Sequence, residues 1–381
     1  MPRVIIIGGG IGGLTTAIAF CRQGWNVSVH EAAPELSPTG QGIWVPVNAM
    51  RVLDRLGLAQ QVSQAGWPLQ SIELRTDSNE LLSSLDVTAG DSRQPHTIIS
   101  IRRSELVTIL SSQLQPGILR LASQFTHFSE EQSLVRAHFL DGSNEAADLL
   151  VGADGIHSRV RKQLFPAIPL RYSGQTCFRG IAALVLPNRI AAGCREIWGG
   201  KNRFGFSAIG SGHVYWFAPQ LAPAGMKDSP DKRMDDLQLA YKNFPYPVAD
   251  ILAASKVEDT LRTDLYDFQP IPHWYRHNIA LMGDAAHAMT PNLGQGGAQA
   301  IEDAFVLAEE TSRNCSLPVA LANYQRIRMP KVKRIVNTAW TLGKIAHWQN
   351  PVARTLRDIA IRMTPAKTRQ KQMNELANLN F

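Results

Sequence analysis

Short apolar runs separated by glycine and polar residues open the chain. An apolar run at Val4 to Ile7 leads into glycines, and a second run spans Val27 to Glu31. Between them lies a stretch that ends at Gly24 and repeats apolar residues at helical spacing, namely Leu14, Ala17, Ile18 and Cys21. The pattern predicts a strand, a helix and a second strand, which is the start of a parallel βαβ unit.

Two further stretches carry clear periodicity. The segment IRRSELVTILSSQL predicts a helix capped by Ser104, with one apolar side formed by Leu106, Ile109, Leu110 and Leu114. The segment VRAHFLDGSNEAADLLVGADG predicts alternating strands joined at Asp141 and Gly142, followed by a buried apolar strand.

The pattern changes from Pro166 to about Asp264. Short β-like runs such as FGFSAI and HVYWFA are broken there by APQLAPAGMKDSPDK, which we interpret as a loop. This predicts a mostly β insert. The chain then returns to the first domain at NIALMGD and is expected to finish in helices after Pro318.

Composition is that of an ordinary globular enzyme with more than one domain. The chain has 381 residues, of which 44% are hydrophobic and 19% charged. The N-terminus runs directly into the first strand, so we expect a cytoplasmic protein without a leader or a membrane span. The cysteines are far apart and lack ligand spacing, so neither a metal site nor a disulfide is expected from Cys21, Cys177, Cys194 and Cys315.

The net charge of +7 is concentrated near the C-terminus. After Pro318, Asp358 and Glu375 are nearly the only acids among the basic residues Arg326, Arg328, Lys331, Lys333, Arg334, Lys344, Arg354, Arg357, Arg362, Lys367, Arg369 and Lys371. Solvated helix faces are the simplest interpretation. Steering of anionic ligands and attraction to a membrane surface remain open. Nucleic-acid binding is not expected, because no binding module accompanies the charge.

The glycine run GGGIGG has the spacing of a dinucleotide site. Gly8 permits a tight turn, Gly10 a close approach to pyrophosphate, and Gly13 close packing of helix on strand, and Gly12 lies in the same run. Glu31 follows about 20 residues later at a strand end, where a carboxylate can bind both ribose hydroxyls.

Two later motifs place an acid directly after an apolar strand. Asp154 should be exposed at the carboxyl edge of the sheet and organise water around a pyrophosphate, while Arg161 and Arg103 could counter phosphate charge or form surface salt bridges. Asp284 is suited to accept a hydrogen bond from a ribityl hydroxyl. We expect His287 to pack or hydrogen-bond in this turn, not to act in catalysis.

A proline and glycine turn leads from the Asp284 motif into the helix AQAIEDAFVLAEE, whose free N–H groups would stabilise an anionic reduced flavin. The turn contains Pro291, Leu293, Gly294, Gly296 and Gly297.

With these motifs in order, the whole chain resembles the group A FAD-dependent aromatic hydroxylases, which have the para-hydroxybenzoate hydroxylase fold. It is similar to the branch with urate and salicylate hydroxylases and zeaxanthin epoxidases. The implied fold is α/β, with a Rossmann-like FAD-binding domain interleaved with a mostly β substrate domain and followed by C-terminal helices. We predict FAD-binding segments at 1–70, 97–165 and 265–317, substrate-domain segments at 71–96 and 166–264, and a helical extension at 318–381.

The resemblance implies a reaction cycle. NADH or NADPH would reduce noncovalent FAD, O2 would add to form a C4a-hydroperoxide, and one oxygen would pass to an electron-rich aromatic ring. No metal is needed. The flavin ring is expected to swing, with Gly40, Gly42 and the turn from Gly294 to Gly297 leaving room. We expect the protein to be a monomer or a homodimer.

On the substrate side the resemblance points to two consecutive strands. Arg203 could hold a carboxylate or phenolate, or be a solvated strand residue. Tyr215 could hydrogen-bond a ring oxygen, or pack within the sheet. Pro291 and Asn292 complete the expected catalytic set. Some relatives carry Asp where Asn292 stands, and an amide takes no proton near neutral pH, so base catalysis there is in doubt.

Alternative functions stay open at this point. An epoxidase or a reductase of the same fold is the nearest, and a flavin-binding regulatory protein without turnover belongs to another class. A plain NAD dehydrogenase is disfavoured, because the Asp154 and Asp284 motifs would have no task.

Overall fold

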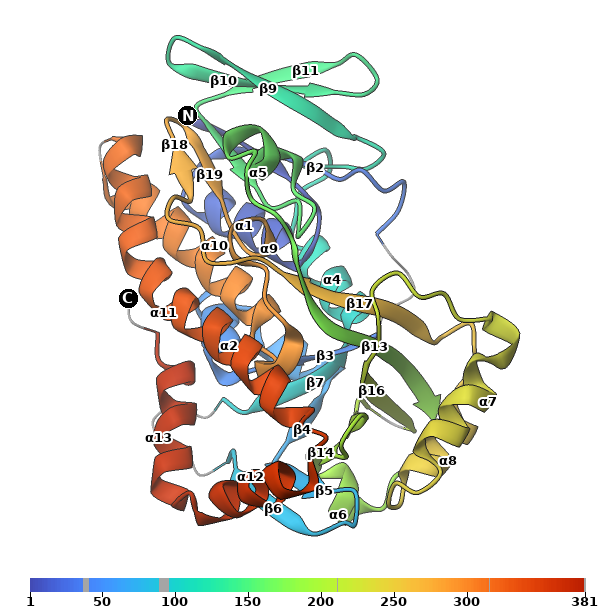
Figure 1. The fold of residues 1–381 in the computed structure, drawn as a ribbon. Helices are drawn as coiled ribbons and strands as arrows, with labels where there is room; N and C mark the ends of the chain where they lie inside the picture. Colours follow the sequence, from blue (N-terminus) through green and yellow to red (C-terminus); the bar gives the residue numbers. More distant parts are fainter. Residues whose placement is uncertain (37–40, 89–95, 211, 315, 380–381) are drawn as a thin grey trace.

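The fold comes from a computed structural model, which describes all residues except 37–40, 89–95, 211, 315 and 380–381. Its first sheet has six strands and places the predicted βαβ unit at its centre (Figure 1). The strand order is β18 (Tyr275–Arg276), β19 (Ile279–Leu281), β12 (Leu149–Gly152), β1 (Arg3–Ile7), β2 (Asn26–His30) and β8 (Leu119–Arg120). All neighbours are parallel except β18 and β19. This confirms the α/β class.

Apolar helices cover this parallel sheet, as a sheet buried on both faces requires. Helix α1 (Ile11–Arg22) packs against α10 (Gly296–Arg313) and α4 (Arg103–Ser111), and α10 packs against α11 (Leu317–Ala346). The shared core is mostly aliphatic and includes aromatic side chains such as Phe20, Phe268 and Trp274. The remaining helices of this part are α2 (Val47–Arg55), α3 (Ala59–Ala65), α5 (Arg159–Leu164), α9 (Asp284–His287) and the 3-10 turn η1 (Pro291–Leu293).

Two small antiparallel sheets flank the first. One joins β11 (Asn144–Ala147), β10 (Leu134–Phe139) and β9 (Phe125–Glu131) at the top of Figure 1, and its β10–β11 hairpin turns at Asp141 and Gly142 as predicted. The other joins β3 (Gly42–Val45), β7 (Ile98–Arg102) and β4 (Trp67–Leu69). Ser104 does not cap α4: the helix starts one residue earlier, at Arg103, and no side chain caps it.

The second large sheet has seven strands drawn from two parts of the chain. Their order is β17 (Leu261–Asp267), β13 (Arg171–Ala183), β16 (His213–Leu221), β15 (Arg203–Ala208), β14 (Gly193–Trp198), β5 (Ser71–Thr76) and β6 (Leu81–Asp86). The insert also holds helices that the sequence pattern missed, α6 (Asn188–Ala191), α7 (Pro230–Tyr241) and α8 (Val248–Ala253). Helix α7 begins inside the stretch expected to be a loop.

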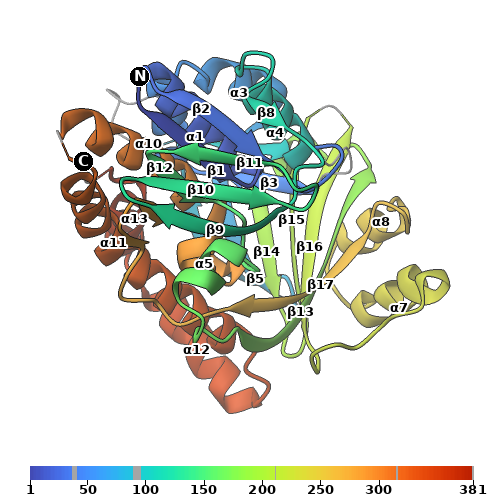
Figure 2. The ribbon, with the colours of Figure 1, turned by 90° about the horizontal axis from the view of Figure 1, so that it is seen from above.

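The two faces of this sheet have different neighbours because successive side chains alternate. Phe204, Phe206 and Trp216 pack with α7 and α8 in a separate apolar core. The opposite face carries Arg203 and Tyr215 and contacts β3, where Trp44 Nε1 donates to Ser207 Oγ at 2.9 Å. Figure 2 shows this sheet lying beside the first one, with helices α11 and α12 (Pro351–Met363) along one side.

The chain finishes in helices, as expected, with α13 (Ala366–Ala377) as the last. Cys21, Cys177 and Cys194 are free thiols, and Cys315 lies outside the described residues.

Candidate active site

The strand ends of the first sheet bring the sequence motifs together. Strands β1, β12 and β19 are adjacent and parallel, so the turns that follow them meet at one edge. A Cβ added at Gly8 would lie 2.4 Å from the carbonyl oxygen of Ala153, and one added at Gly12 would lie 3.2 Å from Met282 Cε. Three motifs that are far apart in sequence therefore form one continuous surface.

The glycines of the first turn have the separate tasks that their spacing predicts. Gly8 has a φ of 110°, which favours glycine. A Cβ at Gly13 would lie 1.9 Å from the carbonyl oxygen of Gly8, so helix α1 can approach the strand only without a side chain there. A Cβ at Gly10 would have no neighbour within 4 Å. The space beside Gly10, at the uncapped N-terminus of α1, is open to a ligand.

Glu31 lies at the end of β2 and is held in place by the backbone. Its Oε2 accepts from the Gly9 N–H at 2.7 Å and its Oε1 from the Ala33 N–H at 2.9 Å. Each carboxylate oxygen has a further lone pair. The carboxylate is thus preoriented and can still accept from ribose hydroxyls.

Asp154 differs from the expectation of an exposed carboxylate. Its Oδ2 accepts from the N–H groups of Arg159 at 2.7 Å and Val160 at 3.2 Å in the first turn of α5, which Ser158 caps, while Oδ1 is buried with no hydrogen-bond partner among the residues described. Burial raises the pKa of Asp154, although hydrogen bonds from Ser158 and from the helix backbone oppose the rise. Its main visible task is to order the turn.

Asp284 follows Gly283 at the edge of the sheet where the three motifs meet. Its side chain is exposed, and it makes no hydrogen bond with any residue that the structure describes. Protein atoms on its other sides remove enough water to raise the pKa of this carboxyl, against the opposing charges of His287, Arg103 and Arg161. A carboxylate in such a recess is available to a ligand hydroxyl.

The two predicted phosphate arginines have different environments. Arg103 is exposed at the start of α4, and its charge acts on Asp284. Arg161 is buried, donates to the carbonyl oxygens of Ala285 at 3.1 Å and Ile156, and lies 4.4 Å from the Phe268 ring centroid. Arg161 therefore ties two motif turns together, and only Arg103 is free to meet a phosphate.

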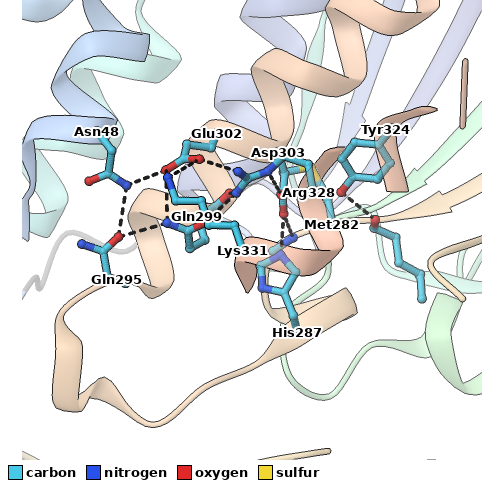
Figure 3. A network of polar contacts seen from close by, with 12 residues as sticks. Asn48, Met282, His287, Gln295, Gln299, Glu302, Asp303, Tyr324, Arg328 and Lys331 are labelled. Carbon is cyan, nitrogen blue, oxygen red and sulfur yellow. Dashed lines mark hydrogen bonds and ion pairs between the residues drawn. The ribbon is translucent and has the colours of Figure 1, made fainter. Parts of the chain in front are cut away.

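A buried network of charges fixes the Gly283 turn from behind (Figure 3). Asp303 accepts from the Gly283 N–H at 2.9 Å, from His287 Nε2 at 2.5 Å and from Arg328 Nε at 2.8 Å. Burial alone would raise the pKa of Asp303, but His287 and Arg328 lower it to about 2. His287 thus has the hydrogen-bonding role that the sequence favoured.

Glu302 extends the same network to helices α2 and α11. It accepts from Lys331 Nζ at 2.8 Å and 3.0 Å, from Asn48 Nδ2 at 2.6 Å and from Arg328. The interpretation of the C-terminal basic residues as solvated faces is wrong for Arg328 and Lys331, which are buried. The available signal was their spacing, because both share the helical face of the apolar residues Val332, Ile335 and Val336.

The turn before α10 lies against β3. Gly294 has a φ of 62°, and a Cβ there would be 3.6 Å from Trp44. A Cβ at Gly297 would be 3.2 Å from Ile43, and one at Gly296 3.9 Å from Asp284 Oδ1. Pro291 is exposed at the start of η1. This uncapped helix start is therefore placed to face the same ligand as Asp284.

At Gly42 in β3, the structure has less open space than the expected swinging motion of the flavin would require. A Cβ at Gly42 would lie 2.2 Å from Tyr215 Cγ, so Gly42 makes room for that ring. Gly40 lies outside the described residues.

Arg203 is neither solvated nor unpaired. It is 1% exposed, its Nε donates to Glu196 Oε1 at 2.8 Å, and its Nη2 donates to the same oxygen. Its Nη1 donates to Asn292 Oδ1 at 2.8 Å. The structure supplies the acid that a buried guanidinium requires, and three of the five N–H donors of Arg203 are used within the protein.

The Asn292 side chain uses both of its N–H donors within the protein. Its amide nitrogen donates to Ala339 O at 3.0 Å and Thr290 Oγ1 at 3.1 Å. Asn292 thus connects the turn before α10 to α11 and, through Arg203, to β15. This is an orienting role without proton transfer.

Tyr215 lies on the face of the seven-stranded sheet that contacts β3. It is 8% exposed, and its hydroxyl hydrogen-bonds Arg179. Burial raises the pKa of Tyr215 to about 12, although Arg179 opposes the rise. The phenol therefore stays protonated at neutral pH.

A cavity of about 610 Å³ extends from this face of the sheet to the C-terminal helices. Trp198 and Leu293 line it near the motif turn, and Glu196 joins them. The remaining lining comes from β5, β6 and the C-terminal helices and is half apolar, with Ile72, Leu74, Leu85, Ile335, Leu342, Ile361, Met373 and Leu376 as its apolar members. Its polar members are Glu73, Ser83, Arg334, Thr338, Thr364, Arg369, Gln372 and Glu375.

These features fit FAD. The open space at Gly10 suits a pyrophosphate, the oriented Glu31 suits the adenosine ribose, and the unpartnered Asp284 carboxylate suits a ribityl hydroxyl. The uncapped N-terminus of α10 suits an anionic ring system.

Comparison with known proteins agrees. The family described as "FAD binding domain" matches residues 1–339. The chain is 37% identical over 365 residues to the aurachin C monooxygenase/isomerase of Stigmatella aurantiaca, covering 94% of each. It is 32% identical over 375 residues to the 2-heptyl-3-hydroxy-4(1H)-quinolone synthase of Pseudomonas aeruginosa strain UCBPP-PA14, covering 97% of this chain and 96% of the relative.

Among solved structures, Klebsiella pneumoniae HpxO complexed with FAD and uric acid superposes with a TM-score of 0.90 at 26% identity, covering 100% of this chain and 96% of that one. The motif geometry and these relatives lead to the same conclusion. The chain belongs to the FAD-binding-domain family of group A flavoprotein monooxygenases.

Proposed function

We propose that the protein uses NADH or NADPH and O2 to hydroxylate an electron-rich aromatic or heteroaromatic ring. The observation that carries this proposal is the closeness of the Asp284 recess to the cavity of 610 Å³. The recess lies beside the turn at Pro291 and Leu293, and Leu293 also lines the cavity. A cofactor site and a ligand-sized cavity thus share one turn. The presence of monooxygenases among the relatives supports the same reaction class.

FAD, when bound and reduced, would supply the chemistry that activates O2. The chain would supply binding and orientation. Asp284 and Glu31 would accept hydrogen bonds from hydroxyl groups of the cofactor, and Arg103 would form an ion pair with its phosphate. Tyr215, protonated at neutral pH, would offer a ring-facing phenol, while Arg203 and Asn292 would position the turn at Pro291.

The cavity favours a ring that carries an apolar chain. Its aliphatic part runs away from the motif turn between the sheet and α11 and α13, a geometry suited to an alkyl substituent. A relative whose name specifies a 2-heptyl quinolone supports this substrate class. Each buried methylene contributes about 0.8 kcal/mol, so a chain of three buried methylenes would strengthen binding by roughly 50-fold.

The central test measures oxygen incorporation. Purified protein should be yellow with noncovalent FAD, and a screen of phenols, aminobenzoates, purines and quinolones should find a ring that stimulates NAD(P)H consumption and takes up one atom of 18O from 18O2. Consumption that needs no O2 would indicate a reductase, and epoxide products an epoxidase. Absence of turnover with every ring would leave a flavin-binding regulator.

The proposal that the cavity binds the alkyl chain of the substrate is tested by blocking the cavity. Leu342→Trp should raise KM for a 2-heptyl quinolone at least tenfold while changing KM for the same ring without the chain less than twofold. Leu239→Trp, at an exposed position on α7, is the matched control. An equal rise of KM for both compounds would show that the alkyl chain binds outside this cavity.

A further inference from the structure

Helix α12 is turned with its polar side toward the protein. Arg357 is buried and donates to Ala346 O at 3.1 Å, and Arg354 forms two hydrogen bonds to Asp77 at 2.9 Å and 3.1 Å. On the same side, Ile361 lines the 610 Å³ cavity. The helix is thus anchored to the body of the protein through charged groups.

The outer face of α12 is an exposed aliphatic stripe. Its members are Val352, Leu356, Ile359 and Met363, with exposed fractions of 67%, 62%, 46% and 76%. At about 100° per residue they fall within roughly 60° of arc and extend along about 17 Å of helix. Soluble helices normally bury such a stripe, so its exposure indicates an apolar partner.

The ends of α12 have the character of a membrane-surface element. Trp348, which is 40% exposed, precedes the helix, and an indole is well suited to the boundary between lipid and water. Exposed cations flank the stripe in sequence, with Lys344 before it and Lys367 and Lys371 after it. Across the described residues, no helix is long and apolar enough to cross a bilayer.

A second copy of the chain fits this surface less well. Four aliphatic side chains offer roughly 400 Å², whereas each partner of a standard interface buries about 800 Å². Lipid sets no such minimum, and the excess of basic residues in the last segment complements anionic headgroups.

We infer that α12 lies in the surface of an anionic lipid bilayer and holds the protein there reversibly, with its aliphatic stripe among the acyl chains. The cavity that Ile361 lines is then placed directly beneath the membrane-facing helix. This attachment does not depend on which ring the enzyme oxidises.

Vesicle sedimentation tests the inference with the whole FAD-loaded protein. The protein should sediment with vesicles of phosphatidylcholine and phosphatidylglycerol, bind pure phosphatidylcholine at least fivefold more weakly, and be released by 0.5 M NaCl. The L356E/M363E variant should bind at least tenfold more weakly. Leu239→Glu, at a position that is 65% exposed on α7, should bind like the unaltered protein.

Folding and self-association are monitored alongside. L356E/M363E should keep its FAD content and melting temperature, because both positions are exposed. Failure of the unaltered protein to bind either vesicle, or equal binding by L356E/M363E, would overturn the inference. So would a concentration-dependent dimer that L356E/M363E abolishes in the absence of vesicle binding, since the stripe would then be covered by a second copy.

Discussion

Asp154 and Asp284 show how two acids that look alike in sequence acquire different tasks. Both follow an apolar strand and a short turn. The Asp154 carboxylate is used by the protein itself, because it accepts from two N–H groups in the first turn of α5, whereas the Asp284 side chain makes no hydrogen bond with the residues described. We therefore expect Asp154 to contribute to the stability of the protein without ligand and Asp284 to contribute to FAD binding.

This difference predicts opposite phenotypes. Asp284→Ala should weaken FAD binding roughly 10- to 100-fold, because a hydrogen bond to a charged group is worth about 1.5–3 kcal/mol. The melting temperature of the apoprotein should stay unchanged. Asp154→Ala should lower the apoprotein's free energy of unfolding by about 1 kcal/mol, because two N–H groups at the start of α5 lose their acceptor. Titration of apoprotein with FAD and thermal melts measure both, and equal FAD loss in the two variants would contradict the assignment.

Arg203 changes meaning once its partners are known. Arg203→Met would leave the Glu196 carboxylate without its opposite charge, although Trp198 Nε1 would still donate to it at 2.9 Å; the loss of one partner costs about 3–5 kcal/mol for a fully buried pair. Glu196 is 20% exposed at its side chain, so we expect about half that loss in the free energy of unfolding, measured by urea denaturation. A substrate anchor would instead lower kcat/KM with unchanged stability. In the double variant with Glu196→Gln, much of the stability should return.

At the scale of elements, helix α1 combines packing and binding in neighbouring glycines. Gly13 is required by the approach of α1 to β1, and Gly10 by the open space at the start of the helix. The two positions differ because a Cβ at Gly13 would meet protein backbone, whereas a Cβ at Gly10 would meet nothing within 4 Å.

Alanine substitutions should separate these tasks. Gly13→Ala places a Cβ 1.9 Å from the Gly8 carbonyl oxygen, so the helix must shift and the protein should be strongly destabilised or fail to fold. Gly10→Ala meets nothing within 4 Å, so the apoprotein should melt normally while FAD affinity falls at least tenfold. An apoprotein of Gly10→Ala that binds FAD normally would show that the pyrophosphate lies elsewhere.

At the scale of the whole molecule, helix α11 connects the FAD-binding half to the seven-stranded sheet. Tyr324 donates to Leu281 O at 3.1 Å in the first sheet, and Gly343 O accepts from Gln175 Nε2 at 3.0 Å in the second. His347, at the end of α11, lies 3.0 Å from Gly343 O and 3.5 Å from Pro219 O.

The buried imidazole predicts a pH dependence. Burial, together with the charges of Arg203 and Arg357, lowers the pKa of His347 to about 4. The unfolded chain, with a pKa near 6.5, then binds more protons between pH 4 and 6.5, so the free energy of unfolding should fall as pH decreases through that window. The loss should reach about 3 kcal/mol at pH 4. Urea denaturation at pH 7 and pH 4.5 measures it, and His347→Gln should show a smaller difference between the two pH values than the unaltered protein.

The sequence by itself determined the parallel sheet, the three turns at its strand ends and the family. These features depend on local patterns: apolar runs of strand length, glycines where no Cβ fits, and acids at strand ends. Gly8, Gly10 and Gly13 could each be assigned a task from spacing alone, since that spacing is imposed by the turn itself.

Only the tertiary structure decided which polar side chains are free. Arg328 and Arg161 are paired with an acid and a carbonyl far away in sequence, and no local pattern encodes such partners. Arg203 is paired with Glu196 on the neighbouring strand and with the distant Asn292. The same holds for α12, whose apolar stripe is readable from sequence but whose exposure depends on packing of the opposite face. The sequence determines the chemistry of each charged or apolar side chain. Whether that side chain can contact a ligand or a partner depends on the residues that the fold packs beside it.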